Sequence, residues 1–428
     1  MTKKESIKNF KKSNLEYEFL SEKNCFVHNF DKDLQLVIIW ENGRRKEKVI
    51  LDIISENFKV LYCAEINWSD KLKESNFNRI YLESSLSKST VKKHDYVGKG
   101  KFLCIIFEDT TPNYGYFQSL DGTISIGNIN VVKTKSYLRN LLNGNLIHSS
   151  ANLCEFFQQA ILIFHEKKLK KIINIKKWDK RIHKLNQDLA GANGWSNFSE
   201  MFSIANFCSD WVILRNFEFF PDDFFGNDED IDILCDNLNI FYSSINAIRR
   251  DGGINSFQTF IDKKKVLLDI RFVGDNYFDP LWEQKMLSRK KYVKNNIPVL
   301  RDDDYFFSLF YHTKIQKKVV KKSYLSKLVK LSKKINFFDF KKSVIEDDQK
   351  AGYLIEGYLK SNNFSFFYPL DTYSYINKSV IKYVDSINNG NNISFSKFIR
   401  NVYSITPPFL QDFIPIVIKK RIKKGLKI

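Results

Sequence analysis

Short apolar runs separated by turn residues recur through the first part of the chain, with helical spacing between some of them. Such runs are typical of buried strands, and helices between strands are typical of an α/β layer. We therefore expect an N-terminal α/β domain over residues 33–165, after a polar lead-in of residues 1–32. The predicted strands lie at residues 36–40, 49–51, 58–62, 80–82 and 102–107, with a turn at Asn42–Gly43.

A second segment, residues 196–300, has a clearer order of elements and follows a basic connector, residues 166–195. Its pattern predicts a mixed sheet, in which a hairpin returns its second strand toward the strand around Asp230. The expected elements are a helix at residues 196–208, a strand at 211–214, the Asp230 strand, a helix from Leu238 that ends at Gly252–Gly253, and a hairpin with strands at 257–260 and around Asp269 and a turn at 262–264.

From Asp302 onward apolar residues recur at helical spacing, as at Leu325, Leu328 and Leu331. This predicts a helical C-terminal region over residues 301–428 that ends in a basic tail. The expected fold class is α/β and α+β multidomain, with an N-terminal α/β domain, a mixed-sheet core and a helical C-terminal region.

Two carboxylates, Asp230 and Asp232, alternate with Ile inside one apolar run, and a third, Asp269, lies in another. Acids in such surroundings are costly to bury unless they bind a metal ion or a partner. Residues two apart on a strand face the same side, so Asp230 and Asp232 are expected to project together. Oxygen-only ligation suits Mg²⁺ or Mn²⁺ better than Zn²⁺. The pattern therefore predicts a metal site at these acids, with Asp269 as third ligand if its strand is a neighbour.

The chain carries a formal charge of +19, mainly from Lys. This balance permits binding to nucleic acid, to an anionic membrane or to a phosphorylated substrate, but a lysine-rich codon bias would also produce it. Nine lysines without an acid fall between Lys314 and Lys334, and more follow in residues 418–428. Such runs are either solvated helix faces or anion-binding surfaces.

Six scattered cysteines without CxxC pairs indicate reduced, buried thiols rather than disulfides or zinc ligands. No stretch of 18 apolar residues occurs, and the N-terminus lacks the apolar segment of a secretion signal. We expect a cytoplasmic protein whose basic C-terminus is a candidate for peripheral contact with a membrane. No P-loop, HExxH, GxSxG or dinucleotide-binding glycine pattern appears.

The order of strand, loop, Asp-x-Asp strand, helix, hairpin, third Asp and helical tail resembles the nucleotidyltransferase superfamily typified by DNA polymerase beta. The chain is also similar to the bacterial and viral branch of that superfamily found with surface-polysaccharide genes, and distantly to the LicD/fukutin phosphotransferases. The matching residues are 212–216, 230–232, 267–270 and a Tyr-His-x-x-x-x-Lys-like segment at 311–317. The superfamily usually carries Gly-Ser or Gly-Gly where this chain has Arg215-Asn216. Arg215 could hold a phosphate there, or Gly226-Asn227 could supply a flexible approach.

The resemblance implies that Asp230 and Asp232 hold Mg²⁺ against substrate phosphates and that Asp269 completes a second metal position and orients an acceptor hydroxyl. It also implies a set of residues around the phosphates. Each has a structural alternative, because the arginines could simply pair with these acids and the histidine could be a packed helix residue. The candidate phosphate-binding or proton-transfer residues are Arg215, Asn216, Arg271, His312, Lys314 and Lys317.

The expected function is a Mg²⁺-dependent transferase that moves a nucleotidyl or phospho-polyol group from a nucleoside triphosphate or nucleotide-activated substrate to a hydroxyl of a glycan or polyol. One alternative is a glycosyltransferase that uses Asp-x-Asp to bind a sugar nucleotide through Mn²⁺; it predicts a nucleotide-binding half upstream and leaves Asp269 without a role. Another is a basic protein that binds a membrane surface or nucleic acid without catalysis, of which nucleic acid is the less expected partner.

The N-terminal domain contains a second polar cluster. Glu108 and Asp109 follow the predicted strand at residues 102–107, and Lys133 and Arg139 lie downstream, before residues 147–152. Ser149 or Ser150 could be the N-cap of the following helix, or the cluster could bind an anion or a phosphosugar.

Overall fold

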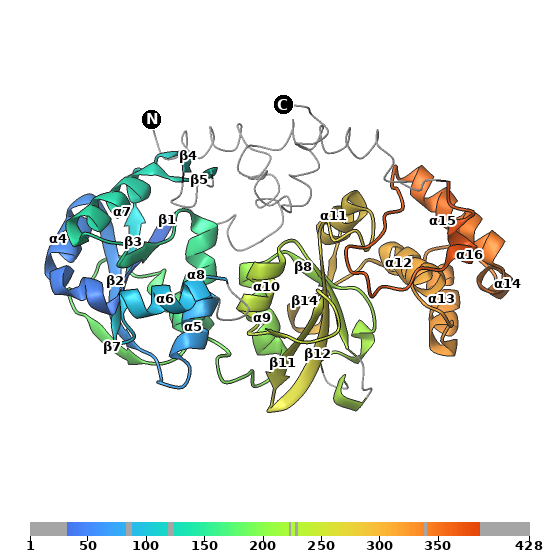
Figure 1. Ribbon diagram of the computed structural model, residues 1–428, viewed down its shortest axis with the longest axis horizontal. Helices are drawn as coiled ribbons and strands as arrows, with labels where there is room; N and C mark the ends of the chain where they lie inside the picture. The colour runs from blue at the N-terminus through green and yellow to red at the C-terminus, as the bar shows by residue number, and fades with distance from the viewer. Residues whose placement is uncertain are drawn as a thin grey trace. The chain divides into compact units, whose positions relative to one another are not determined.

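The computed structural model describes residues 32–82, 88–118, 124–221, 224–226, 230–337 and 340–385. The described chain is a mixed α/β protein and forms two compact units that divide between Asn193 and Gly194 (Figure 1). Almost all of the expected polar lead-in, the basic tail and Asn227 of the Gly226-Asn227 pair lie outside the described residues.

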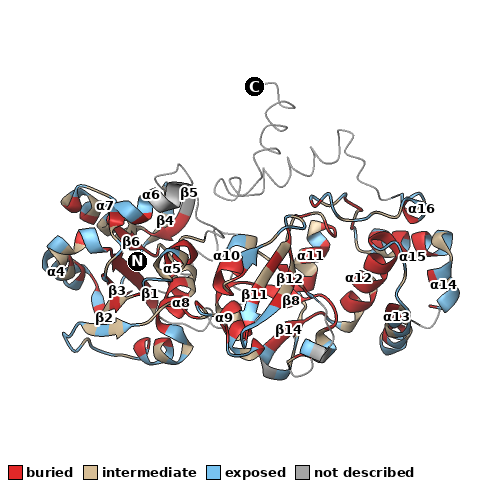
Figure 2. Ribbon diagram, turned by 60° about the horizontal axis from the view of Figure 1, so that its bottom comes forward, coloured by how far each residue is buried: buried red, intermediate tan, exposed pale blue. Residues whose placement is uncertain are grey.

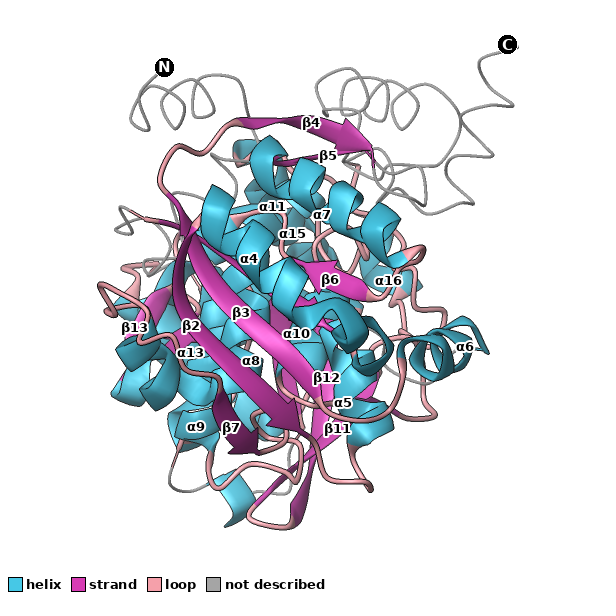
Figure 3. Ribbon diagram, turned by 90° about the vertical axis from the view of Figure 1, so that its left-hand side faces the viewer, coloured by secondary structure: helices cyan, strands magenta, loops and turns pink. Residues whose placement is uncertain are grey.

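The first unit is built on a five-stranded sheet in the order β6-β1-β3-β2-β7. β1 pairs antiparallel with β3 along its whole length, and every residue of both strands is buried. Burial on both faces explains the continuous apolar runs at residues 36–39 of β1 and 102–107 of β3. Figure 3 shows β2 and β3 side by side as the two long strands of this sheet. The strands are β1 (Asp33–Ile39), β2 (Lys59–Asn67), β3 (Phe102–Asp109), β6 (Ile147–Ser149) and β7 (His183–Asn186).

Helices and a separate hairpin complete the first unit. Asn152, not Ser149 or Ser150, caps the N-terminus of α8, because its side chain accepts a hydrogen bond from the Glu155 backbone N–H. Ser150 instead accepts from the Leu36 N–H and donates to Gln35. The elements are α4 (Glu47–Asn57), α5 (Lys73–Ile80), α6 (Lys88–Val97), the hairpin β4 (Tyr114–Gln118) and β5 (Ile124–Asn128), α7 (Ile129–Leu142) and α8 (Leu153–Ile172).

Two of the predicted strands in this unit are wrong. Residues 49–51 lie in α4, where Ile50 and Ile54 face the core four residues apart, which is helical spacing. Residues 80–82 fall at the C-terminal end of α5, where Phe77 and Ile80 are buried three apart. The expected connector also belongs largely to the first unit, because α8 continues to residue 172 and β7 pairs parallel with β2.

The second unit contains a seven-stranded mixed sheet in the order β10-β11-β12-β9-β8-β14-β13. β9 and β12 are parallel neighbours, and β8 is antiparallel to β9. The predicted hairpin is present, and its turn residues Asp262 and Lys263 both have left-handed φ angles, as a tight hairpin turn requires. The strands are β8 (Trp211–Ile213), β9 (Ile231–Cys235), β10 (Ile248–Arg249), β11 (Ser256–Ile261), β12 (Lys264–Phe272), β13 (Lys291–Val293) and β14 (Ile297–Val299).

The helix predicted from Leu238 is shorter than expected. It ends at Ser244, since Asn246 takes a left-handed φ of 51° and the chain then enters β10 with Ile248 exposed. The helices of this unit are α9 (Phe198–Cys208), α10 (Leu238–Ser244), α11 (Pro280–Ser288), α12 (Asp302–Ile315), α13 (Lys322–Lys334), α14 (Lys342–Glu346), α15 (Asp348–Ser361) and α16 (Lys378–Ile381).

One hydrophobic core joins the sheet of this unit to its C-terminal helices. Val212 and Leu234 of the sheet share it with Trp282 of α11, Phe306 of α12 and Ile355 of α15. Figure 2 shows α12 as one of the most deeply buried helices, and its residues from Ser308 to Ile315 are all buried. The mixed sheet and the helical region, predicted as separate segments, therefore form one packed unit.

Candidate functional site

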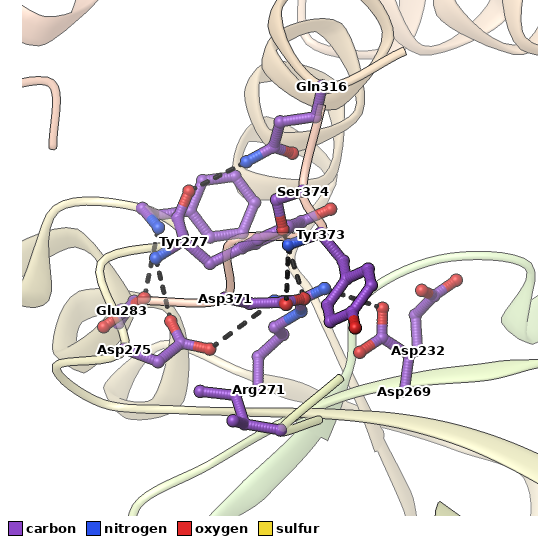
Figure 4. A network of polar contacts seen from close by, with 12 residues as sticks. Asp232, Asp269, Arg271, Asp275, Tyr277, Glu283, Gln316, Asp371, Tyr373 and Ser374 are labelled. Carbon is purple, nitrogen blue, oxygen red and sulfur yellow. Dashed lines mark hydrogen bonds and ion pairs between the residues drawn. The ribbon is translucent and has the colours of Figure 1, made fainter. Parts of the chain in front are cut away.

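The pairing of β9 with β12 places two of the predicted acids side by side. Asp232 and Asp269 are direct partners in the parallel register, and the flanking Ile233 and Ile270 are buried on the opposite face. Asp230 precedes β9 and lines the same cavity. In Figure 4, the Asp232 and Asp269 side chains extend from the sheet next to one another. The alternation of acid and Ile thus directs the carboxylates to one side of the sheet, as predicted.

These acids line a cavity of about 500 Å³ within the second unit. Its walls come from β9, β12, the start of α13 and a loop that precedes α16. Six cationic side chains face four carboxylates, so the charge of the wall favours an anionic ligand. The cations are Arg215, Arg250, Arg271, Lys317, Lys318 and Lys321, and the acids are Asp230, Asp232, Asp269 and Asp371.

Arg215 forms a buried ion pair with Asp232. Burial, together with the nearby carboxylates of Asp269 and Asp230, raises the pKa of Asp232 to about 6 in spite of the lowering effect of Arg215. The arginine therefore compensates only part of the negative charge that the three acids concentrate. Hydrogen bonds among the described residues engage one oxygen of Asp232, which leaves the other for a ligand.

Arg271 connects the acid pair to more distant parts of the chain (Figure 4). Its guanidinium lies 3.1 Å from Asp269, 3.5 Å from Asp371 and 3.9 Å from Asp275. The cation also lies 4.0 Å from the centre of the Tyr277 ring. Since all of these partners are fixed by the fold, Arg271 holds its position beside Asp269 without help from a ligand.

The remaining predicted residues divide between the cavity and the protein interior. Asn216 lines the cavity with a left-handed φ of 57°, and its side-chain oxygen accepts from Lys327 at 3.0 Å. Lys317 also lines the cavity. Lys314 does not, because its ammonium donates to the Ile345 carbonyl and to Asp348, both at 2.7 Å.

His312 lines the cavity wall but is almost wholly buried. Its Nδ1 lies 2.8 Å from the Tyr277 hydroxyl, and its Nε2 has no hydrogen-bond partner among the described residues. Burial, followed by the charges of Arg215 and Lys317, lowers the pKa of His312 well below its ordinary value. A neutral imidazole that solvent does not reach fits a packed helix residue better than a proton carrier.

We expect His312 to make the unfolding free energy depend on pH. Below about pH 6.5 the unfolded chain binds a proton at His312, while the folded chain does not. The free energy of unfolding therefore falls by up to about 1.4 kcal/mol for each pH unit below that value. His312→Gln should therefore flatten the slope between about pH 6.5 and pH 5, measured by urea unfolding. Buried acids such as Asp275 have the opposite effect on the pH dependence, but they do so equally in the parent and the variant. If the free energy of unfolding changes with pH equally in the parent and in His312→Gln, the prediction is contradicted.

Several cavity residues were not found from the sequence. Asp371, Tyr373 and Tyr375 come from the loop before α16, and Tyr277 comes from the turn before α11. No periodic pattern marks them. The closest signal is the alternation of tyrosines with polar residues at 371–375, which suits neither a buried helix nor a buried strand.

The acids fit a Mg²⁺ ion only in part as they stand. Among the described residues, no three acidic, histidine or cysteine side chains lie close enough to hold one ion. Mg²⁺ in phosphoryl-transfer sites is, however, held by one or two carboxylates together with substrate phosphates and water. Asp232 and Asp269, with one oxygen each outside the arginine contacts, meet that smaller requirement.

The polar cluster of the first unit is internally paired instead of open. Asp109 accepts hydrogen bonds from Asn128 and Asn130 at 2.8 and 2.9 Å, and Glu108 pairs with Lys59. Lys133 is exposed on α7, six residues before Arg139. These contacts give no support to the alternative of an anion or phosphosugar site there.

In the part of the chain that the structure describes, no helix combines the length and apolar character needed to cross a bilayer. Comparisons of the chain with family models, curated proteins and solved structures found no match. The case for a function therefore rests on the cavity of the second unit.

Proposed function

We propose that the chain is a Mg²⁺-dependent nucleotidyl- or phosphotransferase whose site is the cavity around Asp232 and Asp269. The observation that carries the proposal is the register pairing of these two acids beside two arginines, in a polar cavity with an excess of cationic side chains. Carboxylates for a metal ion and cations for phosphate oxygens are the two requirements of phosphoryl transfer.

The roles of the residues follow from their positions. Asp232 and Asp269, with Asp230 at the edge, would hold Mg²⁺, which supplies a positive centre for phosphate oxygens. Lys317 and Lys321 line the same cavity and would bind the same phosphates. Arg271 keeps Asp269 oriented toward an acceptor hydroxyl. Asn216 has a left-handed backbone that Gly or Asn adopts readily, so the departure from Gly-Ser is compatible with a tight approach of the chain to a ligand.

A glycosyltransferase with an Asp-x-Asp motif is less well supported. A glycosyltransferase mechanism gives Asp269 no role, whereas Asp269 lies beside Asp232 in the same cavity. It also needs a nucleotide-binding half upstream, which is usually a parallel sheet. In the first unit, β1, β2 and β3 pair antiparallel. A surface glycan or polyol as acceptor follows from the resemblance alone, and so does a place in surface-glycan biosynthesis.

A basic binding protein without catalysis makes a different prediction. Its affinity for nucleic acid or anionic vesicles should fall steeply with salt and survive Asp230→Asn. The transferase proposal predicts instead that removing an acid abolishes turnover.

The test is to incubate the full chain with Mg²⁺ and nucleoside triphosphates labelled at the α or the γ phosphate, with polyol and glycan acceptors. We expect Asp269→Asn to lower transfer of label by a hundredfold or more, since loss of groups that only orient metal ligands already costs about 10- to 100-fold. Asp262→Asn is the matched control, because Asp262 is exposed at the turn of the same hairpin. Label transfer that is equal in parent and Asp269→Asn would refute the proposal.

A further inference from the structure

The cavity is bordered by a strap, residues 370–377, that comes from far along the chain. The Leu370 N–H donates to the Asp275 carbonyl at 2.8 Å, and the Asn377 N–H donates to the Ile315 carbonyl at 2.7 Å. Between these ends, Asp371 accepts from the Tyr373 N–H at 3.1 Å and contacts Arg271. The backbone of the strap is thus fixed at both ends and in the middle.

The strap carries aromatic side chains that the fold does not bury. Tyr373 is 79% exposed, more than any other large hydrophobic side chain among the described residues, although its backbone is held by Asp371. Tyr375, two residues on, also lines the cavity. In Figure 4, the Tyr373 ring lies on the side of Asp371 that faces Asp232 and Asp269. An exposed ring on a fixed backbone, next to a charged cavity, offers a flat apolar face to a ligand.

A cation lies next to one of these rings. Lys318 Nζ lies 5.7 Å from the centre of the Tyr375 ring, and Lys317 and Lys321 line the same cavity. A ligand that fits these residues combines negative charge with a flat ring. Stacking on tyrosine suits every nucleobase, because each base has a π-face.

We propose that Tyr373, with Tyr375, forms a stacking platform for the nucleobase of a nucleoside triphosphate whose phosphates lie toward Lys317, Lys321 and the acids. This inference rests on the proposed function and adds the part of the substrate that the strap recognises. It assigns to Tyr373 a role in binding, and none in the transfer step.

The test compares two ligands in the presence of Mg²⁺, a nucleoside triphosphate and inorganic tripolyphosphate, by calorimetric titration of the full chain. Tyr373→Ala should weaken nucleoside triphosphate binding by roughly 5- to 150-fold, the range for loss of one base stack, and should leave tripolyphosphate binding within about twofold. Tyr373→Phe should bind both ligands like the parent. Tyr353→Ala is the matched control, since Tyr353 is 58% exposed on α15 and lies outside the cavity.

The outcomes separate the two proposals. If the parent binds neither ligand, the transferase proposal and the platform both fail. If the parent binds both ligands and Tyr373→Ala binds the nucleoside triphosphate equally well, the platform fails while the transferase proposal stands. An equal weakening of both ligands would also overturn the platform, because the ring would then act through the shape of the strap.

Discussion

Replacing Arg215 with Met is expected to lower the free energy of unfolding by about 3 to 5 kcal/mol, because Asp232 would remain buried without its counter-ion. The loss should shrink as the pH falls toward about 6 and stay small below it, because the variant lacks the arginine that lowers the pKa of Asp232 and a protonated Asp232 needs no positive partner. Urea unfolding at two pH values measures both effects.

A double variant tests the cause of this loss. Arg215→Met combined with Asp232→Leu removes both charges and should recover most of the stability, because an apolar pair of similar size is often as stable as a buried ion pair. Lys342→Met breaks the exposed pair with Glu346 and should cost less than about 1 kcal/mol. A double variant that is no more stable than Arg215→Met would show that the ion pair is not what the single substitution breaks.

The second large effect is expected at Trp282, which is 1% exposed in the core between the sheet and the C-terminal helices. Its ring contacts the rings of Phe278, Tyr311 and Phe364. Trp282→Ala should destabilise the second unit by about 3 to 5 kcal/mol through the cavity that it leaves. Leu281→Ala is the control on the same helix, because Leu281 is 48% exposed and should change stability by less than about 0.5 kcal/mol.

The number of unfolding transitions of Trp282→Ala is as informative as the midpoint of its unfolding. If the mixed sheet and the helices α12 to α16 share one core, Trp282→Ala should shift the unfolding of both together. A variant in which fluorescence and circular dichroism report separate transitions would contradict a single cooperative unit.

Strand alternation and turn chemistry accounted for the part of the site that lies on the sheet. Asp232 could be placed because Ile flanks it on both sides, and Asp269 because a hairpin returns its strand to the same sheet. The same reasoning was wrong at residues 49–51, where three consecutive apolar residues resemble a strand although the buried positions Ile50 and Ile54 follow a helix. Short apolar runs do not distinguish the two.

The rest of the site depends on contacts that leave no periodic trace. Asp371 and Tyr373 reach the cavity because single hydrogen bonds and an ion pair fix an irregular loop, and such contacts join residues with any spacing. The ion pairs of Arg215 and Arg271 were foreseen as an alternative to phosphate binding, and the structure contains both of them. Lys314 shows the limit of a linear motif, since it lies three residues before Lys317 but donates to Ile345 and Asp348 instead of lining the cavity.

The contact between Arg271 and Asp371 joins residues 100 positions apart. During synthesis, the acids on β9 and β12 leave the ribosome well before the strap that borders their cavity. A nascent or truncated chain that ends before Asp371 therefore carries these acids but lacks one wall of the cavity. The cavity can be completed only after the strap has been synthesised, later than the strands that carry the acids.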